Sequence, residues 1–240
     1  MWAVYKKELK TYFYSPLAYV LSGIFVLVFG IYFLTQTMSK VGQGIAQFVF
    51  GGQLYFASFW LVMLIPILTM RVFAEERRNG TEVLLMTSPV SVPQIVIGKF
   101  LAAFTVFLTM TALTAIFPII ISIKGELVLS AALSSYLGFI LLGASFVAFG
   151  LFTSSITESQ IIAAVLGTVT LFFILLIDQL KTLVSGFLLK VINQLSLYEH
   201  YKQFVQSVIS LNDIVFFLSI TAMFLLLVMI VIEKRRWSQG

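Results

Sequence analysis

Long stretches without a charged residue alternate with short charged segments along this chain. Each stretch is strongly apolar and extends over about 20 residues, the length that an α-helix needs to cross about 30 Å of hydrocarbon. The pattern therefore predicts an all-α membrane protein with six transmembrane helices. We place these helices at residues 17–36, 54–73, 92–121, 133–152, 161–177 and 214–232.

The first 15 residues predict an amphipathic helix that lies in the membrane interface before the first span. One face of this helix is aromatic and apolar and consists of Trp2, Tyr5, Leu9 and Tyr12. Lysines lie on the other sides of the helix, as expected for a helix among lipid headgroups. Ser15 and Pro16 then fit the cap and the first residue of the next helix.

Polar and small residues inside the spans allow two interpretations each. Four threonines of the third span either line a polar path or bond to a carbonyl one turn earlier, and the second is commoner. They are Thr105, Thr109, Thr111 and Thr114. Small residues in the fourth and fifth spans favour close packing within the chain over a subunit interface. They are Ala144, Ala148, Ala163 and Gly167.

Composition limits the protein to one membrane domain over residues 1–240. The chain is 60% hydrophobic and 10% charged, and it has no Cys and one His. A disulfide framework and a metal site built from Cys and His are therefore excluded, and we expect His200 at the surface. Residues 178–213 form the longest segment between spans, where the spacing of Phe204, Val205, Val208 and Ile209 predicts short helices. Asn212–Asp213 would cap the last span.

The distribution of Lys and Arg predicts that both termini are cytoplasmic. With that orientation, 10 of these cations lie on the cytoplasmic side and 5 on the outside, as the positive-inside rule requires. The net charge of +5 follows from this bias. We therefore expect lipid, and no nucleic acid, among the partners of the chain.

The densest polar chemistry lies between the second and third spans. A charged helix ends at Gly80, a residue suited to the left-handed cap conformation. One apolar turn, residues 83–86, follows before Thr87, Ser88 and Pro89 break the helix. Ser91 to Gln94 fit a capping box that opens the third span. The apolar turn either packs on the protein's own loops and lipid or fits a groove on a soluble partner, and we favour the partner.

Four segments resemble the ABC-2-type permeases, the membrane subunits of one class of ATP-binding-cassette transporters. The most specific is FAEERRNGTEVLLMTSPVS, which is similar to the coupling loop of that family. The others are KKELKTYFYSP, FTSSITESQ and SLYEHYKQFVQSVISLNDIVFFL. The resemblance extends over the whole chain and is closest to the gliding-motility and nitrous-oxide-reductase-maturation branch.

The resemblance implies a permease subunit of an ATP-driven exporter in a prokaryotic inner membrane. It would dimerise with a second permease copy and couple to a dimeric ABC ATPase, which would hold ATP and Mg, through residues 74–91. The implied coupling residues are Glu75, Glu76, Arg77, Arg78, Gly80, Thr81, Glu82, Leu84, Leu85, Thr87, Ser88, Pro89 and Ser91. Thr157, Glu158 and Gln160, which also fit a capping box, mark a second inner loop, and residues 1–15 correspond to the family's elbow helix.

The chain carries no ATP-binding motif of its own, because Gly98–Lys99 lacks the upstream glycine and following Ser or Thr of a P-loop. We therefore expect a non-catalytic subunit without a cofactor or metal. Two alternatives remain open. A membrane-embedded hydrolase would use Glu75 and Glu76, but it needs bases within the spans. A passive channel or a non-transporting anchor of a cell-surface machine would not need ATP hydrolysis.

Overall fold

The structure is a computed structural model that describes residues 1–37, 54–82, 90–124, 128–177, 194 and 196–238. In these residues every regular element is helical. The elements are α1 (Trp2–Tyr14), α2 (Pro16–Tyr32), the π-helical turn η1 (Phe33–Thr37), α4 (Leu54–Thr69), α5 (Arg71–Arg78), α7 (Val92–Leu113), α8 (Ile116–Lys124), α9 (Leu129–Ile156), α10 (Gln160–Ile177), α12 (Leu197–Val205) and α13 (Leu211–Ser238).

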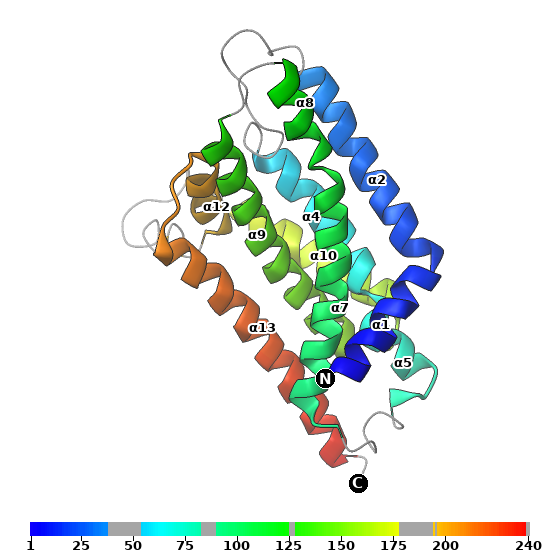
Figure 1. Cartoon of the computed structure of the whole chain (residues 1–240). Helices are drawn as coiled ribbons and strands as arrows, with labels where there is room; N and C mark the ends of the chain where they lie inside the picture. Colours follow the sequence, from blue (N-terminus) through cyan, green and yellow to red (C-terminus); the bar gives the residue numbers. More distant parts are fainter. Residues whose placement is uncertain (38–53, 83–89, 125–127, 178–193, 195, 239–240) are drawn as a thin grey trace.

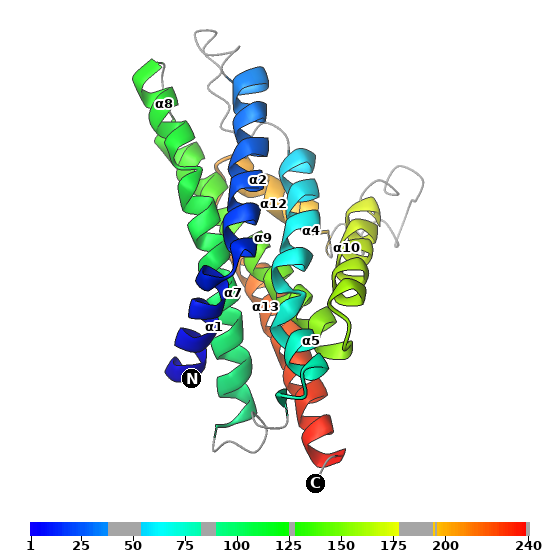
Figure 2. The ribbon, with the colours of Figure 1, turned by 90° about the vertical axis from the view of Figure 1, so that its right-hand side faces the viewer.

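Helix α9 forms the centre of the bundle. Helices α4, α5, α7, α10, α12 and α13 all pack against it, as Figures 1 and 2 show from two sides. In its most apolar window 83% of the residues are buried, compared with 17% in α13. The core is rich in Phe, and it includes Phe25, Phe29, Phe107 and Phe139. The most buried helix, α9, is thus the one that the other helices pack against, while α13 exposes most of its surface.

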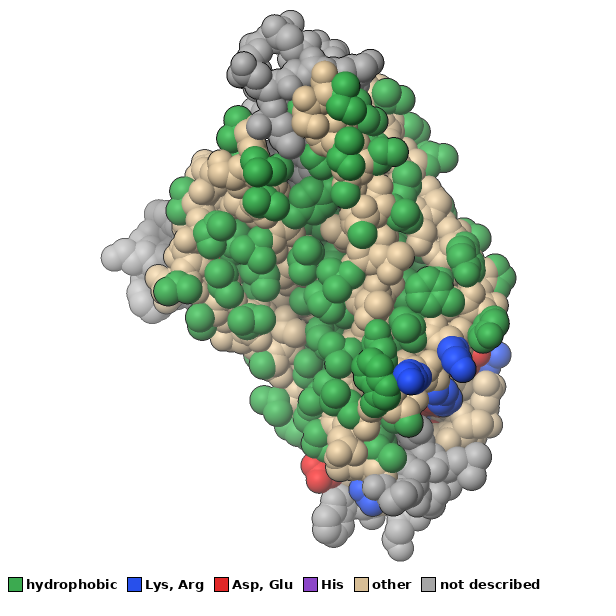
Figure 3. Space-filling view, in the orientation of Figure 1, with side chains coloured by type: hydrophobic (Ala, Val, Ile, Leu, Met, Phe, Trp, Pro, Cys, Tyr) green, Lys and Arg blue, Asp and Glu red, His purple; other side chains and the backbone are tan. Residues whose placement is uncertain are grey.

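The exposed surface divides into an apolar body and a charged end. Figure 3 shows hydrophobic side chains over most of the visible face, with Lys, Arg, Asp and Glu gathered near α1, α5 and the C-terminus. Both termini lie toward this end (Figure 1). A surface that is apolar along the length of its helices suits a lipid environment.

Among the described residues, five helical stretches are long and apolar enough to cross a membrane. They are Pro16–Gln36, Ser58–Arg78, Val92–Ile123, Leu129–Ile156 and Leu211–Arg236. A shorter apolar helix covers Gln160–Leu176. The predicted all-α membrane class is therefore confirmed. A sixth crossing, and the side on which the termini lie, stay predictions.

The predicted third span is interrupted near its end. Helix α7 ends at Leu113, and α8 begins at Ile116. Pro118 lacks the N–H that would continue the helix by bonding to the Thr114 carbonyl. That carbonyl instead accepts from the Phe117 N–H at 3.0 Å. The predicted third span, residues 92–121, lies within the apolar stretch Val92–Ile123, but it consists of two helices because the proline acts four residues before its own position.

Helix capping is as predicted before α2 but not before α7. The Ser15 Oγ accepts from the Leu17 N–H at 3.3 Å, and Pro16 is the first residue of α2. Ser91 precedes α7, yet its side chain makes no capping hydrogen bond. The predicted capping box at Ser91 is therefore wrong, although the helix begins where it was expected.

Two other caps lie a few residues from their predicted positions. Thr157 is not the cap of α10, because its Oγ1 accepts from the Ser159 N–H at 2.9 Å and α10 begins at Gln160. Helix α13 begins at Leu211, so Asn212–Asp213 lie in its first turn. Ser210 precedes that turn, and its Oγ accepts from the Asn212 N–H at 3.3 Å. Several neighbouring polar residues compete at each site, and sequence spacing alone did not choose among them.

The segment before α13 is helical over a shorter range than predicted. Helix α12 ends at Val205. Val208 and Ile209 lie beyond it and are exposed, so the predicted helical spacing does not extend to them. Residues 178–193 and 195 of this segment lie outside the described part of the chain.

Hydroxyl and small side chains in the spans serve packing within the chain. Each of the four threonines, three on α7 and Thr114 directly after it, bonds to a backbone carbonyl three or four residues earlier, at 2.6–3.0 Å. Ala148 and Ala163 are fully buried, and a Cβ at Gly167 would lie 3.0 Å from the Cβ of Pro66. Both favoured interpretations of these residues are confirmed.

Candidate functional site

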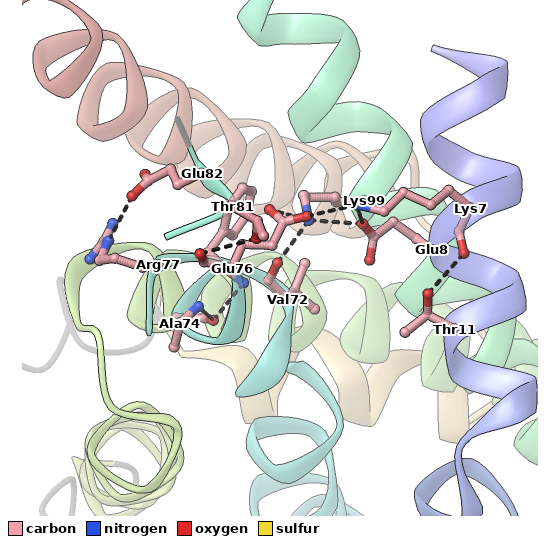
Figure 4. Close-up of polar contacts among 12 residues, drawn as sticks. Lys7, Glu8, Thr11, Val72, Ala74, Glu76, Arg77, Thr81, Glu82 and Lys99 are labelled. Atoms are coloured by element: carbon pink, nitrogen blue, oxygen red, sulfur yellow. Dashed lines mark hydrogen bonds and ion pairs between the residues drawn. The ribbon is translucent and has the colours of Figure 1, made fainter. Parts of the chain in front are cut away.

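A group of buried charges joins three helices near the two termini. Lys99, on α7, has no exposed surface and forms ion pairs with Glu8 at 3.0 Å and Glu76 at 2.9 Å. Its Nζ also donates to the Val72 carbonyl at 2.8 Å. Lys7 completes the group through Glu76 at 3.0 Å (Figure 4). We call Lys7, Glu8, Glu76 and Lys99 the Lys99 cluster.

The sequence around Lys99 allows α1 to reach α7. Gly98 lies against α1, where a Cβ would be 3.2 Å from both the Met1 carbonyl oxygen and the Val4 Cβ. Glu8 shares the buried stripe of α1 with Val4 and Tyr12. A buried ammonium is tolerated only where ion pairs and hydrogen bonds replace water. The close approach of α1 to α7 therefore brings Glu8 to Lys99, and the three acceptors of Lys99 make its burial between the helices possible.

The buried face of α1 differs in part from the aromatic and apolar face that the sequence predicts. Tyr12 is buried, and Tyr5 and Leu9 are half-buried, but Trp2 is 62% exposed. The Tyr12 hydroxyl donates to the Leu68 carbonyl at 3.0 Å, and burial raises the pKa of this phenol above its usual value. Glu8 takes a place on the buried side that the aromatic pattern did not predict.

Lys7 closes the cluster on its exposed side. Partial burial lowers the pKa of this ammonium, but Glu76 and Glu8 together raise it more, and the net shift is upward. Its side chain remains 59% exposed. The exposed Lys7 and the buried Lys99 thus together balance the negative charges of Glu8 and Glu76.

Helix α5 ends as the sequence predicts. Gly80 has φ of 69°, in the left-handed region. Its N–H donates to the Arg77 carbonyl at 3.0 Å, and the Thr81 N–H donates to the Glu76 carbonyl at 2.9 Å. This pair of bonds is a Schellman motif, which ends a helix by satisfying its last carbonyls. The chain therefore leaves α5 in a fixed direction.

Helix α5 is also attached to the end of α9. The Ser154 Oγ accepts from the Phe73 and Ala74 N–H groups at 3.1 and 3.2 Å and donates to the Met70 carbonyl at 3.0 Å. These contacts satisfy the backbone where α4 and α5 separate at Met70. Arg77 donates to the Ser155 carbonyl and pairs with Glu82 at 3.2 Å. Three helices, α1, α7 and α9, therefore hold α5 by polar contacts.

The remaining predicted coupling residues include side chains with polar partners and exposed residues, and Thr81 is both. Glu75 pairs with Arg71 at 2.9 Å, and the Thr81 hydroxyl donates to the Glu76 carbonyl at 3.2 Å. The exposed residues are Arg78, Gly80, Thr81 and Ser91. Five predicted residues lie outside the described part of the chain: Leu84, Leu85, Thr87, Ser88 and Pro89.

The second inner loop lies beside α5. Arg77 bonds to the carbonyl of Ser155, as described above, and Arg235 of α13 donates to the Ile156 carbonyl at 3.3 Å. Both carbonyls end α9 directly before Thr157, Glu158 and Gln160. The two predicted loops are therefore brought together at one end of the bundle, although Glu158 itself is exposed.

Sequence reasoning missed Glu8, Lys99 and Ser154. A lysine inside a long apolar helix that begins at Val92 signals a buried carboxylate partner, because an isolated charge there is too costly. Glu8 repeats at four-residue spacing with Val4 and Tyr12, which also indicates burial. Ser154 carries no such signal, since serines at the ends of membrane helices have many partners.

A comparison with protein families identifies the family of this chain. The family described as ABC-2 family transporter protein matches residues 2–235. A search of curated proteins finds no match. The family match includes α1, α5, α7 and the end of α9, which together build the site. The chain therefore belongs to the ABC-2 transporter family, as one of its transmembrane permeases.

Proposed function

We propose that this chain is the membrane subunit of an ATP-driven exporter and that its Gly80–Ser91 segment docks on a separate ABC ATPase. The ATPase dimer would bind ATP and Mg, and nucleotide would drive its closure. Helix α5 would receive that movement and pass it to the spans. Residues 157–160 would form a second contact with the ATPase.

The observation that supports this proposal is the attachment of α5 to three other helices. Ion pairs through Glu76 join it to α1 and α7, and Ser154 joins it to α9. A force on the end of α5 would displace these helices together, because polar contacts in a buried site resist separation. A rigid-body movement of this kind is a common element of two-state transport.

The proposal includes a topology and an assembly. The end that holds α1, α5 and the termini would face the cytoplasm, in line with the positive-inside rule. Helix α10, with 18 residues, would provide the sixth crossing. Two permease copies, identical or from sister chains, would enclose the translocation path in the inner membrane of a prokaryote.

Docking is tested with Leu84→Asp combined with Leu85→Asp. Charges at two apolar positions should abolish co-purification of the soluble ATPase, because an interface core does not accept unpaired charge. Gln94→Asp with Lys234→Asp, two exposed positions at the same end, is the matched control and should keep binding. Unchanged binding in the Leu84/Leu85 variant would refute the docking site.

A second experiment separates transport from anchoring. A hydrolysis-deficient ATPase that still binds the permease should abolish the biological activity of the complex. Full activity with that ATPase would support a non-transporting anchor in place of the exporter.

A further inference from the structure

The single histidine of the chain lies in a site that the coupling proposal does not use. His200, on α12, places Nδ1 within hydrogen-bonding distance of the Asp213 carboxylate on α13. Its Nε2 lies 3.2 Å from the Gln194 carbonyl oxygen. The ring stacks on Phe216 with centroids 3.8 Å apart and planes at 22°. Helix α12 is thereby joined to the first turns of α13.

Both ring nitrogens of His200 therefore face hydrogen-bond acceptors. A neutral imidazole has one N–H and satisfies one acceptor, whereas an imidazolium donates from both nitrogens. The stacked Phe216 ring also favours a cation, because an aromatic face carries partial negative charge. The doubly protonated ring can therefore satisfy both acceptors, whereas the neutral ring can satisfy only one.

Asp213 supplies the opposite charge. Asp213 is 2% exposed, and its Oδ2 has no hydrogen-bond partner among the described residues. Asp213 lies in the first turn of α13, where the helix dipole favours an anion. A buried carboxylate with one unpartnered oxygen needs a nearby cation. Among the described contacts of Asp213, His200 is the side chain that supplies a cation when its ring is protonated.

Among the described residues, the other charged groups near His200 are few and lie mainly on its own helix. Helix α12 carries Glu199 and Lys202, and burial raises the pKa of its Tyr201, which stays neutral. Tyr198 is the other titratable residue of α12. Asp213 is the charged residue in the first turn of α13. Helices α9 and α4, which also pack against α12, contain no Asp, Glu, Lys, Arg or His in their sequences.

We infer that His200 and Asp213 form a proton-dependent contact that fastens α12 to α13. As an imidazolium, His200 donates to Asp213 and to the Gln194 carbonyl. When it loses a proton, one nitrogen becomes an acceptor, and the better arrangement keeps Nδ1–H on Asp213. The Nε2 lone pair then faces the Gln194 carbonyl, so that contact becomes repulsive. The bond from Nδ1–H to Asp213 also loses the charge of its donor, so the contact between α12 and α13 weakens.

The contact matters for the bundle because α12 also packs on α9. The Ser134 hydroxyl donates to the Phe204 carbonyl at 2.6 Å, and Phe204 is fully buried. Loosening α12 would weaken this packing at the end of α9 that is remote from α5. The contact itself does not depend on the coupling proposal. Only its exposure to the pH outside the cell rests on the proposed topology.

The unique histidine allows a direct test on the full chain in lipid nanodiscs. Labelling with ¹⁵N-histidine gives the signals of one ring, which distinguish the imidazolium from the neutral tautomers. Hydrogen exchange of the α12 amides is followed over the same pH range, with rates corrected for the intrinsic effect of pH. We expect exchange in α12 to rise about tenfold as the ring becomes neutral, the effect of losing one hydrogen bond to a charged group.

Two variants of α12 provide the comparison. His200→Gln should remove the pH dependence of α12 exchange. Lys202→Gln, which changes an exposed cation on the same helix, should retain it. Equal α12 exchange on both sides of the ring transition, or an unaltered pH dependence in His200→Gln, would overturn the inference. If His200→Gln does not fold, the pH dependence of α12 exchange in the wild type alone tests the inference.

Discussion

Buried charges join helices at two separate places in this permease, and the two places differ in chemistry. The Lys99 cluster combines two lysines and two glutamates from α1, α5 and α7. The contact between α12 and α13 combines one histidine and one aspartate. Lysine and glutamate keep their charges near neutral pH, whereas histidine is the side chain that commonly changes charge between about pH 5 and 8.

This difference in charge chemistry makes the Lys99 cluster a permanent connection between helices and the His200–Asp213 contact an adjustable one. The Lys99 cluster holds the helices through which ATPase movement would pass, and such a connection must not weaken during the cycle. The His200–Asp213 contact holds a short helix beside the start of α13, where loosening leaves the α5 contacts intact. Three substitutions measure how far this contrast holds.

Removal of the central cation should have the largest effect. Lys99→Met leaves Glu8 and Glu76 buried without their partner, and breaking a buried ion pair costs about 3–5 kcal/mol. We expect that loss in the unfolding free energy of the purified protein. Adding Glu8→Gln and Glu76→Gln should recover much of it, because no uncompensated charge is then buried.

Lys10→Met is the matched control for Lys99→Met, since Lys10 is exposed on α1. Its unfolding free energy should stay near that of the wild type. If Lys99→Met were equally harmless, the Lys99 cluster would not be a structural connection, and the contrast between the two places would fail.

Packing at the other end should show a smaller effect. A Cβ at Gly138 of α9 would lie 2.6 Å from the Phe204 Cβ of α12. Gly138→Ala should therefore displace α12 and lower stability by about 1–3 kcal/mol, the usual cost of overpacking. Hydrogen exchange should locate the loss in α12.

Gly23→Ala separates this steric effect from the general effect of glycine in a helix. A Cβ at Gly23 would have no heavy atom within 4 Å, so alanine there should be neutral or stabilising by up to about 1 kcal/mol. A loss in Gly138→Ala spread evenly over α5 and α12 would show that the two ends are not independent.

Lys7→Met should have the smallest effect, because exposed ion pairs contribute between 0 and about 1 kcal/mol. The pKa of Lys7 is raised above 10.5. Its contribution is therefore complete below pH 10.5 and disappears as the pH rises through the raised value. Thermal unfolding of wild type and Lys7→Met should differ slightly at pH 7 and converge at strongly alkaline pH. A large difference at pH 7 would show that Lys7 contributes as much to stability as a buried ion pair, contrary to this prediction.

Local signals along the chain were sufficient for much of the fold. Charge-free runs predicted the long apolar helices, and Ser15–Pro16 predicted the start of α2. The glycine after Arg77, Arg78 and Asn79 predicted the end of α5. Each of these features depends on residues within one or two turns, and sequence spacing reports such interactions directly.

Contacts between distant residues were not accessible in the same way. Lys99 and Glu8 lie 91 positions apart, and Ser154 lies 81 positions from Phe73. Only the packing of α1, α5, α7 and α9 brings them together. No partner of Lys99 was predicted from the sequence. Asp213 was interpreted as a helix cap, because a local role explains it without a distant histidine.

The balance of signs in the Lys99 cluster has an electrical consequence. A membrane potential acts on net charge and does about 2.3 kcal/mol of work per elementary charge moved through 100 mV. Two lysines and two glutamates sum to zero, so these four side chains can shift together along the membrane normal without electrical work. Voltage across the membrane would then neither drive nor oppose a displacement of these four side chains.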